Sequence, residues 1–276
     1  MPSAMGCTSM RWHWPCRLSK GISLGYNKRW ETASGNGDSM RTWLANLLAW
    51  TSSVKDEQDL VNGVQRVAWE LDFEWFSFGV CTALPFSNPI MQMRCNFSST
   101  WQRRYSDADF LLVDPSVQRA RACTTPFLWQ GELMRKMPQF WEEARAAGLR
   151  YGWACSRTNA SRHQSMLTLA RSGSTLDVTE LNAKELKMRW LAETIAPVME
   201  RLLITPSHQA QHYRLTAREI EVLRWTADGK TQEEIAQILA ISFDTVKFHV
   251  KNAVGKLGAT NKTAAVVRAA VLGIIS

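Results

Sequence analysis

The chain has 276 residues, of which 45% are apolar and 21% are charged. These proportions are typical of globular domains, and they exclude collagen-like, coiled-coil and largely disordered chains. The length accommodates one large domain or two ordinary ones. The net charge is +8, and residues 205–276, about a quarter of the chain, carry +3 of it against +2 for the much longer stretch 40–204, which suits a nucleic-acid partner.

No apolar run approaches the roughly 18 residues that a membrane span needs, and residues 1–6 lack the apolar stretch of a secretory signal. The six cysteines show neither a CxxC pair nor the spacing of metal ligands. We therefore expect reduced thiols in a cytoplasmic protein that has no metal or other cofactor and no membrane contact.

Residues 1–39 form the first segment, and their apolar side chains follow no period. The stretch 34–38 is rich in turn formers, and regular patterning begins at Met40. We expect residues 1–39 to be a poorly ordered extension, such as the product of an upstream start codon. A functional basic arm is the alternative.

Residues 40–203 carry helical and strand patterns in turn. Apolar positions from Leu60 to Leu71 recur at steps of three and four and predict a helix with an acidic first turn. The other predicted elements are strands at 73–81, 90–97, 151–157 and 165–171 and helices at 138–147 and 177–203. Pro197 is expected to bend or split the helix at 177–203. This order predicts an α+β fold, an α/β/α sandwich around an antiparallel sheet.

Residues 204–214 lack periodicity and contain a proline, so they are predicted to link this domain to a second domain at 215–276. The second domain shows four helix signals and is expected to be all-α. Capping boxes begin at Thr216 and Thr231, and Ser242 caps the third helix. Two short helices joined by a tight turn predict a helix-turn-helix. A small helical bundle with a solvated lysine face is the alternative.

The third helix of this domain is the candidate DNA reader. Its predicted buried stripe leaves Lys247, Phe248 and Lys251 facing outward. Lysine donates to guanine, and phenylalanine contacts the thymine methyl group. The backbone amides around Thr245, at the start of the helix, can meet a phosphate.

The domain resembles the LuxR/GerE helix-turn-helix over nearly all of 215–275, through the residues at 215–225, 229–231, 234–236, 241–242, 245–249, 252, 256–257 and 261–262. The resemblance implies that Lys247, Phe248 and Lys251 reach the bases of double-stranded DNA, while Thr231 and Thr245 lie near phosphates. It also implies that the fold is held by Glu219, Leu223 and Gly229, and that 272–275 supports dimerisation.

In the first domain, Trp101, Tyr105, Asp114 and Trp129 suggest a pocket. Indole and phenol groups are directional donors on apolar bodies, and a carboxylate accepts an amide N–H. Such a set recognises an uncharged amide in an apolar cavity. The alternative is that Asp114 lies in a surface turn before Pro115.

The spacing of these four residues, with Trp141 and Gly148–Gly152 after them, resembles the autoinducer-binding domain of LuxR-type quorum-sensing receptors. The resemblance runs from about residue 40 to residue 203, and through residues 73–79, Trp153 and residues 165–169 it looks closest to QscR-like receptors. It implies that the ligand is an N-acyl homoserine lactone, with Trp101 donating to its lactone carbonyl and Asp114 accepting its amide N–H.

The same resemblance implies that Thr168 and Ser77 lie near the acyl carbonyl and that Tyr105 and Trp129 wall the cavity. Gly152 is expected to be a close-packing position. Phe97 stands where many relatives carry a tyrosine that donates to the acyl carbonyl, so that hydrogen bond must come from elsewhere or be absent.

Together these features predict a quorum-sensing transcriptional regulator that binds a palindromic promoter site as a homodimer. An apolar stripe, Leu191/Ile195/Val198/Leu202, offers a dimer interface. The alternative is that this stripe packs on its own sheet. A response regulator is disfavoured because no paired acids follow the first strand, and the chain lacks GxSxG, P-loop, HExxH and GxGxxG motifs, so we expect no enzyme. A further alternative, which the sequence leaves open, is a receptor that acts by sequestering its signal or by pairing with other receptors.

Overall fold

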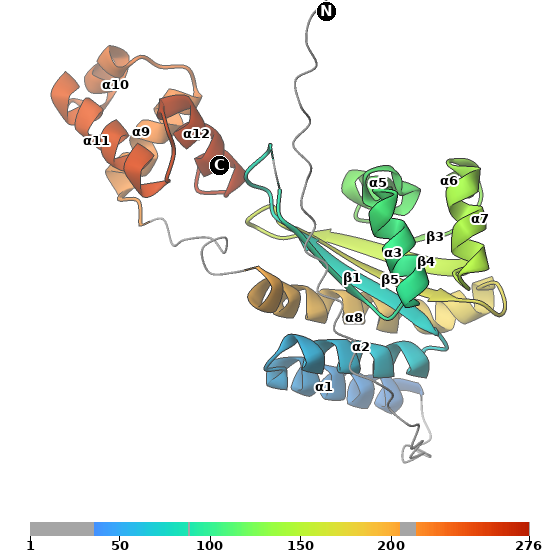
Figure 1. Cartoon of the computed structure of the whole chain (residues 1–276). Coiled ribbons are helices and arrows are strands. Elements are labelled where there is room, and N and C mark those ends of the chain that lie inside the picture. The colour runs from blue at the N-terminus through green and yellow to red at the C-terminus, as the bar shows by residue number, and fades with distance from the viewer. Residues whose placement is uncertain (1–35, 88, 205–213, 276) are drawn as a thin grey trace, which may run out of the picture. The chain divides into compact units, whose positions relative to one another are not determined.

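The computed structural model describes residues 36–87, 89–204 and 214–275 (Figure 1). The chain divides into two compact units, one built around a sheet and one whose regular elements, within residues 214–275, are all helices. Of the predicted N-terminal extension at 1–39 and the predicted linker at 204–214, residues 1–35 and 205–213 lie outside the described residues.

The sheet of the first unit is antiparallel, with strand order β2-β1-β5-β4-β3. Its strands are β1 (Trp75–Cys81), β2 (Met91–Cys95), β3 (Phe127–Leu128), β4 (Tyr151–Thr158) and β5 (Gln164–Arg171). The four longer strands were predicted. The short edge strand β3 was not, and it pairs with β4 so that Phe127 lies opposite Ala154.

Helices cover both faces of this sheet, which confirms the predicted α/β/α sandwich (Figure 1). One face carries α1 (Asn36–Ser53), α2 (Glu57–Glu70) and α8 (Val178–Leu203). The opposite face carries the shorter helices α3 (Ser99–Asp107), α4 (Phe110–Val113), α5 (Pro115–Ala122), α6 (Glu132–Arg135) and α7 (Pro138–Ala146).

The alternation of side chains along a strand decides which face each residue serves. In β1, Phe76 and Phe78 are buried, whereas Trp75 packs against the aromatic cluster beneath the short helices. In β2, Met93 joins that same cluster, and its neighbour Arg94 turns the other way to pair with Glu57 of α2 at 2.6 Å. The face covered by the short helices is therefore the one that holds the candidate ligand site.

Two expectations about the long helices need correction. The first helix, α1, begins at Asn36, before the predicted onset of regular structure at Met40. Asparagine, glycine and aspartate favour turns, but they are also tolerated where a helix begins. In the last helix, Pro197 lies inside α8 without splitting it, and the bend at this residue stays a prediction.

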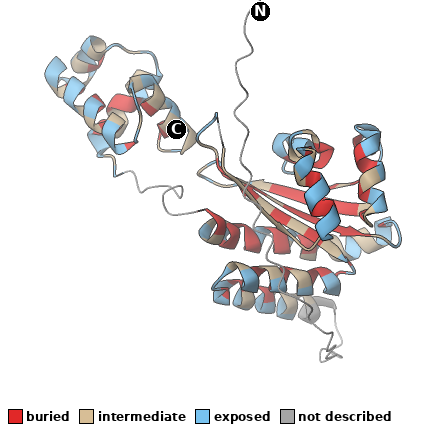
Figure 2. Cartoon of the chain, in the orientation of Figure 1, coloured by how far each residue is buried: buried red, intermediate tan, exposed pale blue. Residues whose placement is uncertain are grey.

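The apolar stripe of α8 is also not a free dimer surface. Leu191, Ile195 and Val198 are buried within their own unit, and Leu202 is half-buried. Figure 2 shows much of α8 in the colour of buried residues. The sequence pattern shows that one face of a helix is apolar, but not what covers it. The dimer interface predicted on this stripe is therefore wrong, and the alternative, packing within the unit, is correct.

The second unit consists of α9 (Ala217–Ala227), α10 (Gln232–Leu239), α11 (Phe243–Lys256) and α12 (Lys262–Val271). Both predicted capping boxes are present, at Thr216 and Thr231, and each pairs the hydroxyl with a glutamate three residues later. Gly229 follows α9 with a φ of +85°, a conformation that favours glycine. These local signals set the short helices and the tight turn of a helix-turn-helix.

Candidate functional site

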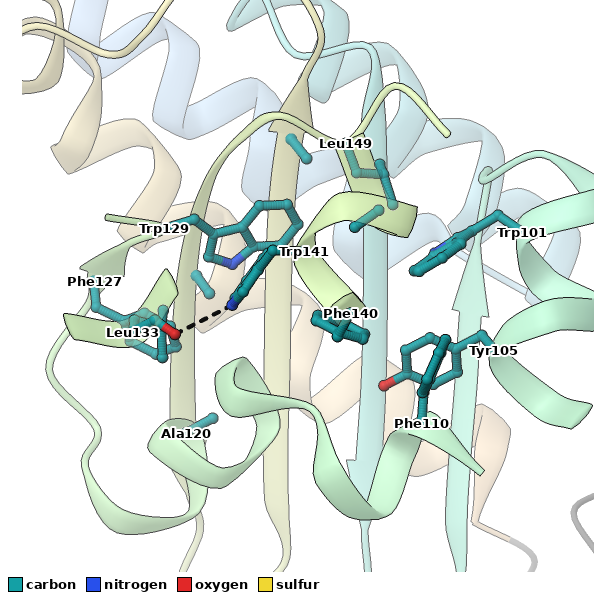
Figure 3. Packing of buried hydrophobic residues seen from close by; sticks show 13 residues of the cluster. Trp101, Tyr105, Phe110, Ala120, Phe127, Trp129, Leu133, Phe140, Trp141 and Leu149 are labelled. Carbon is teal, nitrogen blue, oxygen red and sulfur yellow. Dashed lines mark hydrogen bonds between the residues drawn. The ribbon is translucent and has the colours of Figure 1, made fainter. Parts of the chain in front are cut away.

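An aromatic cluster lies between the sheet and the short helices (Figure 3). Helix α3 supplies Trp101 and Tyr105, which share one face because they are four residues apart. The ring of Phe140, from α7, lies 5.9 Å from that of Trp101 and 5.0 Å from that of Trp141, and Trp141 in turn lies 5.2 Å from Trp129. The cluster thus connects the predicted residues of α3 to the tryptophan that follows β3.

A buried carboxylate lies at the edge of this cluster. The Tyr105 hydroxyl donates to Asp114 Oδ2 at 2.9 Å, and the backbone N–H of Ser116 donates to Asp114 Oδ1 at 2.7 Å. Asp114 caps α5, whose first residue is Pro115. It is buried, so the surface-turn alternative is wrong.

Burial controls the protonation of this pair. Loss of solvent raises the pKa of Asp114 above its ordinary value, although the hydrogen bonds from Tyr105 and Ser116 oppose the change. Burial and the nearby carboxylate together raise the pKa of Tyr105 well above its ordinary value. The Ser116 hydroxyl lies close enough to the carboxylate to lower the pKa of Asp114. Its distances and angles do not meet the criteria of a hydrogen bond to any described residue, so this buried hydroxyl is unpartnered.

Two indole N–H groups in this region are buried without a hydrogen-bond partner in the described part of the chain, those of Trp129 and Trp75. Leaving a buried donor unsatisfied costs about 1–3 kcal/mol. Trp129 was predicted as a wall residue, but Trp75 and Ser116 were not predicted. Strand alternation, which puts Trp75 on the face of Ser77, and the capping position of Asp114, which brings in Ser116, could have indicated both.

The remaining predicted ligand residues surround the cluster. Phe97 follows β2 and packs against the cluster while half-buried. Thr168 is buried in β5, between Met166 and Ala170 on the face that the cluster covers. Ser77 is half-buried in the neighbouring strand β1. The structure therefore places all the predicted ligand residues on one side of the sheet.

Trp129 also borders a cavity of about 380 Å³, whose lining includes Gly131, Met134, Arg145 and Arg150. None of the other predicted ligand residues lines this cavity. Because Trp129 belongs to both, the cavity adjoins the aromatic cluster but is not the predicted site itself.

The second unit presents the candidate DNA interface on α11. Its buried stripe consists of Val246, Val250 and Ala253, followed by Leu257 at the helix end. On the opposite side, Lys247, Phe248 and Lys251 are exposed, as predicted, and the large apolar ring of Phe248 is 59% exposed.

The hydroxyl-bearing residues predicted near phosphates both lie at helix starts. Thr231 caps α10 by accepting from the backbone N–H of Glu234 at 3.2 Å. Thr245 lies in the first turn of α11, where its hydroxyl is 2.8 Å from that of the capping Ser242. Helix starts attract anions, so both positions suit a phosphate contact, which stays a prediction.

Comparisons with known proteins agree with this division. Residues 56–196 match the family described as "Autoinducer binding domain", and residues 213–269 match "Bacterial regulatory proteins, luxR family". The transcriptional activator protein AnoR of Acinetobacter nosocomialis is 36% identical over 238 residues, which span 86% of this chain and 100% of AnoR. The regulatory protein SdiA of Escherichia coli is 30% identical over 238 residues, which span 85% of this chain and 97% of SdiA.

The fold agrees as well. A crystal structure of Escherichia coli SdiA superposes with a TM-score of 0.73 at 29% identity and covers 86% of this chain and 99% of SdiA. Among the described residues, no helix combines the length and apolarity that crossing a membrane requires. The closer likeness to QscR-like receptors stays a prediction. The chain belongs to the LuxR family of bacterial transcriptional regulators, as a quorum-sensing member with an autoinducer-binding domain and a helix-turn-helix DNA-binding domain.

Proposed function

We propose that the signal is an N-acyl homoserine lactone and that it binds in the aromatic cluster beside Asp114. The observation that carries this proposal is the buried Tyr105–Asp114 pair, a carboxylate acceptor held among aromatic rings. An uncharged amide N–H is the donor that such an acceptor recognises, and the rings offer apolar walls to an acyl chain. SdiA has been solved in complex with octanoyl-rac-glycerol, which likewise joins an acyl chain to a small polar head.

In this arrangement each side chain has a distinct part. Trp101 donates its indole N–H to the lactone carbonyl, and Asp114 accepts the amide N–H. Thr168 and Ser77 offer hydroxyls near the acyl carbonyl, where Phe97 has no donor. Tyr105 and Trp129 form the walls, and the unpartnered indole N–H of Trp129 supplies a further donor.

The proposal is tested by ligand-dependent stability. A ligand that binds only the native state stabilises it by about 2.7 kcal/mol at a hundredfold excess over Kd. We expect the full-length protein to melt at higher temperature with acyl homoserine lactones than with the matching free fatty acids. Identical melting curves across a panel of chain lengths would overturn the assignment of the ligand.

We also propose that the ligand-bound protein acts in the cytoplasm as a homodimer on a palindromic promoter site. One helix-turn-helix reads few base pairs, so useful specificity requires two copies. Lys247, Phe248 and Lys251 would reach the bases, and Thr231 and Thr245 would contact phosphates. The expected half-site centres lie about one helical turn apart, near 10 base pairs.

Binding to a full palindrome and to its isolated half-site tests this second part. A dimer should bind the palindrome much more tightly, because the second half-site is engaged without a further loss of translational freedom. Equal affinity for the two duplexes would contradict the dimer.

A further inference from the structure

One carboxylate lies among the proposed DNA-reading side chains of α11. An α-helix has about 3.6 residues per turn, so positions three, four and seven residues apart share a face. Asp244 stands three residues before Lys247, four before Phe248 and seven before Lys251. All four side chains are exposed, and they lie opposite the stripe that α11 buries. Asp244 is therefore part of the face that the three predicted residues define.

Asp244 also lies near the N-terminal end of α11. It is the second residue after the capping Ser242, in the first turn of the helix. In helix-turn-helix proteins the N-terminal residues of the second helix contact the base edges. Asp244 is thus placed toward the bases, two turns ahead of Lys251.

The charge of Asp244 makes this position chemically selective. Within the residues that the structure describes, no lysine or arginine forms an ion pair with it, and the other charged members of this face are cations. A carboxylate carried into a groove lined by phosphates is repelled unless it accepts a hydrogen bond there. The amino group of cytosine is the donor that aspartate accepts from in the major groove.

We infer that Asp244 reads a base: its carboxylate accepts a hydrogen bond from a cytosine amino group, so that each half-site carries a preferred cytosine. This inference rests on the proposed binding of a palindromic site through α11. It adds that Lys247 and Lys251 supply attraction, while Asp244 rejects sequences that offer it no amino donor.

The competing explanation is that Asp244 only stabilises the start of α11, where negative charge is favourable. The two roles differ in what they change. If Asp244 only stabilises the helix, its replacement lowers the melting temperature and weakens binding to all DNA sequences equally. If Asp244 reads a base, its replacement changes the base preference at one position. It also strengthens binding to unrelated DNA, because the carboxylate that repels phosphates is gone.

The test is selection from a duplex library with randomised inverted repeats, using the full-length protein saturated with an acyl homoserine lactone. The variants are Asp244→Asn and, as a control, Asp228→Asn, which removes an exposed carboxylate from the C-cap of α9, outside α11. Wild type and Asp228→Asn should share a cytosine preference of roughly tenfold at one half-site position. Asp244→Asn should lose that preference and bind random duplex severalfold more tightly.

Two results would overturn the inference, and they are distinguishable. If Asp244→Asn keeps the complete base profile of the wild type, Asp244 does not read a base, and the proposed function stands. If the wild type itself selects no sequence over random DNA, the proposed DNA-binding function fails, and this inference fails with it.

Discussion

The Trp129 indole lies directly on the backbone of Gly152. A Cβ atom at residue 152 would stand 2.5 Å from Trp129 Cε3 and 2.7 Å from Cε2, closer than real Cβ contacts allow. The two backbones are joined as well, because the Trp129 N–H donates to the Gly152 carbonyl at 2.8 Å. The expected close-packing role of Gly152 is confirmed, and the contact places Trp129 where its ring meets Trp141.

Gly152→Ala should therefore displace Trp129 and disturb the aromatic cluster. We expect a loss of about 1–3 kcal/mol in the free energy of unfolding, as for other overpacked cores, and a weaker response to lactone. Chemical denaturation with and without ligand measures both effects. Gly173→Ala is the control, since a Cβ there meets nothing within 4 Å. If the two variants have the same free energy of unfolding, the close contact between Trp129 and Gly152 does not contribute to stability.

Asp114→Asn should weaken the binding of the lactone. Loss of the charged acceptor should weaken lactone binding by at least tenfold, since a hydrogen bond to a charged group contributes about 1.5–3 kcal/mol. Dose–response curves of a promoter reporter measure this loss. A wild-type curve from the variant would refute the role given to Asp114.

The same variant has a pH signature without ligand. Burial raises the pKa of Asp114, so the folded state binds its proton more tightly than the unfolded chain does. The contribution of Asp114 to the free energy of unfolding therefore falls as pH rises from about 4, the ordinary carboxyl pKa, through the raised value. Relative to Asp114→Asn, the wild type should lose stability over that range. Urea unfolding of both proteins at several pH values checks the sign, and a gain by the wild type would contradict it.

Phe97→Tyr should strengthen lactone binding. Phe97 packs half-buried against the cluster, and a tyrosine there would bring a hydroxyl donor toward the proposed acyl carbonyl. One neutral hydrogen bond contributes about 0.5–1.5 kcal/mol, so the midpoint of the lactone response should fall by up to about tenfold. An unchanged or raised midpoint would show that the carbonyl lies elsewhere.

Glu219→Gln should destabilise the helix-turn-helix unit. Burial alone would raise the pKa of Glu219, but Lys256, at 2.8 Å from both carboxylate oxygens, and the Thr216 N–H hold that pKa below its ordinary value. The stabilisation is present at neutral pH and is lost as pH falls through the lowered pKa. We expect a loss of about 1–2 kcal/mol at pH 7, reduced by the partial exposure of Lys256.

The control for that variant is Glu221→Gln on the same helix. Glu221 pairs with Arg218 at 2.7 Å, but both side chains are exposed, so the loss should stay below about 0.5 kcal/mol. Thermal unfolding of the full-length proteins compares the two substitutions. Equal losses would mean that the burial of Glu219 adds nothing to its ion pair.

Substitution of the two lysines of α11 and substitution of Thr231 should change DNA binding in different ways. Lys247→Ala and Lys251→Ala should each cost about 1–3 kcal/mol of specific binding where the lysine contacts a base. Thr231→Ala should weaken binding to all sequences evenly, since phosphate contacts carry no base information. Competition with unrelated duplex DNA measures the specificity ratio. If the lysine variants lose affinity for specific and unrelated DNA equally, the lysines do not contact bases.

Local signals predicted much of this molecule. The capping boxes at Thr216 and Thr231 and the outward face of α11 depend on neighbours within a few residues, so the sequence alone indicates them. The two-residue strand β3 could not be predicted this way, because it exists only through pairing with β4. The short helices α4 and α6 carry too few residues to show a period.

The candidate site divides in the same manner. The spacing of Trp101, Tyr105, Asp114 and Trp129 was sufficient to propose a common pocket, and the structure brings them to one side of the sheet. The role of Gly152 beneath Trp129 followed from the resemblance, but its cause is a contact between β4 and the residue after β3. The error over α8 has the opposite origin, because an apolar stripe looks the same whether a sheet or a second copy covers it.

The central claim is that the aromatic cluster binds an acyl homoserine lactone through Asp114. The most direct measurement is mass spectrometry of the lipid extracted from full-length protein that was expressed with a mixture of such lactones, for the wild type and for Asp114→Asn. The account predicts one or a few lactones at close to one per wild-type chain and a large depletion in the variant. Wild-type protein without bound lactone, or equal retention by Asp114→Asn, would contradict it.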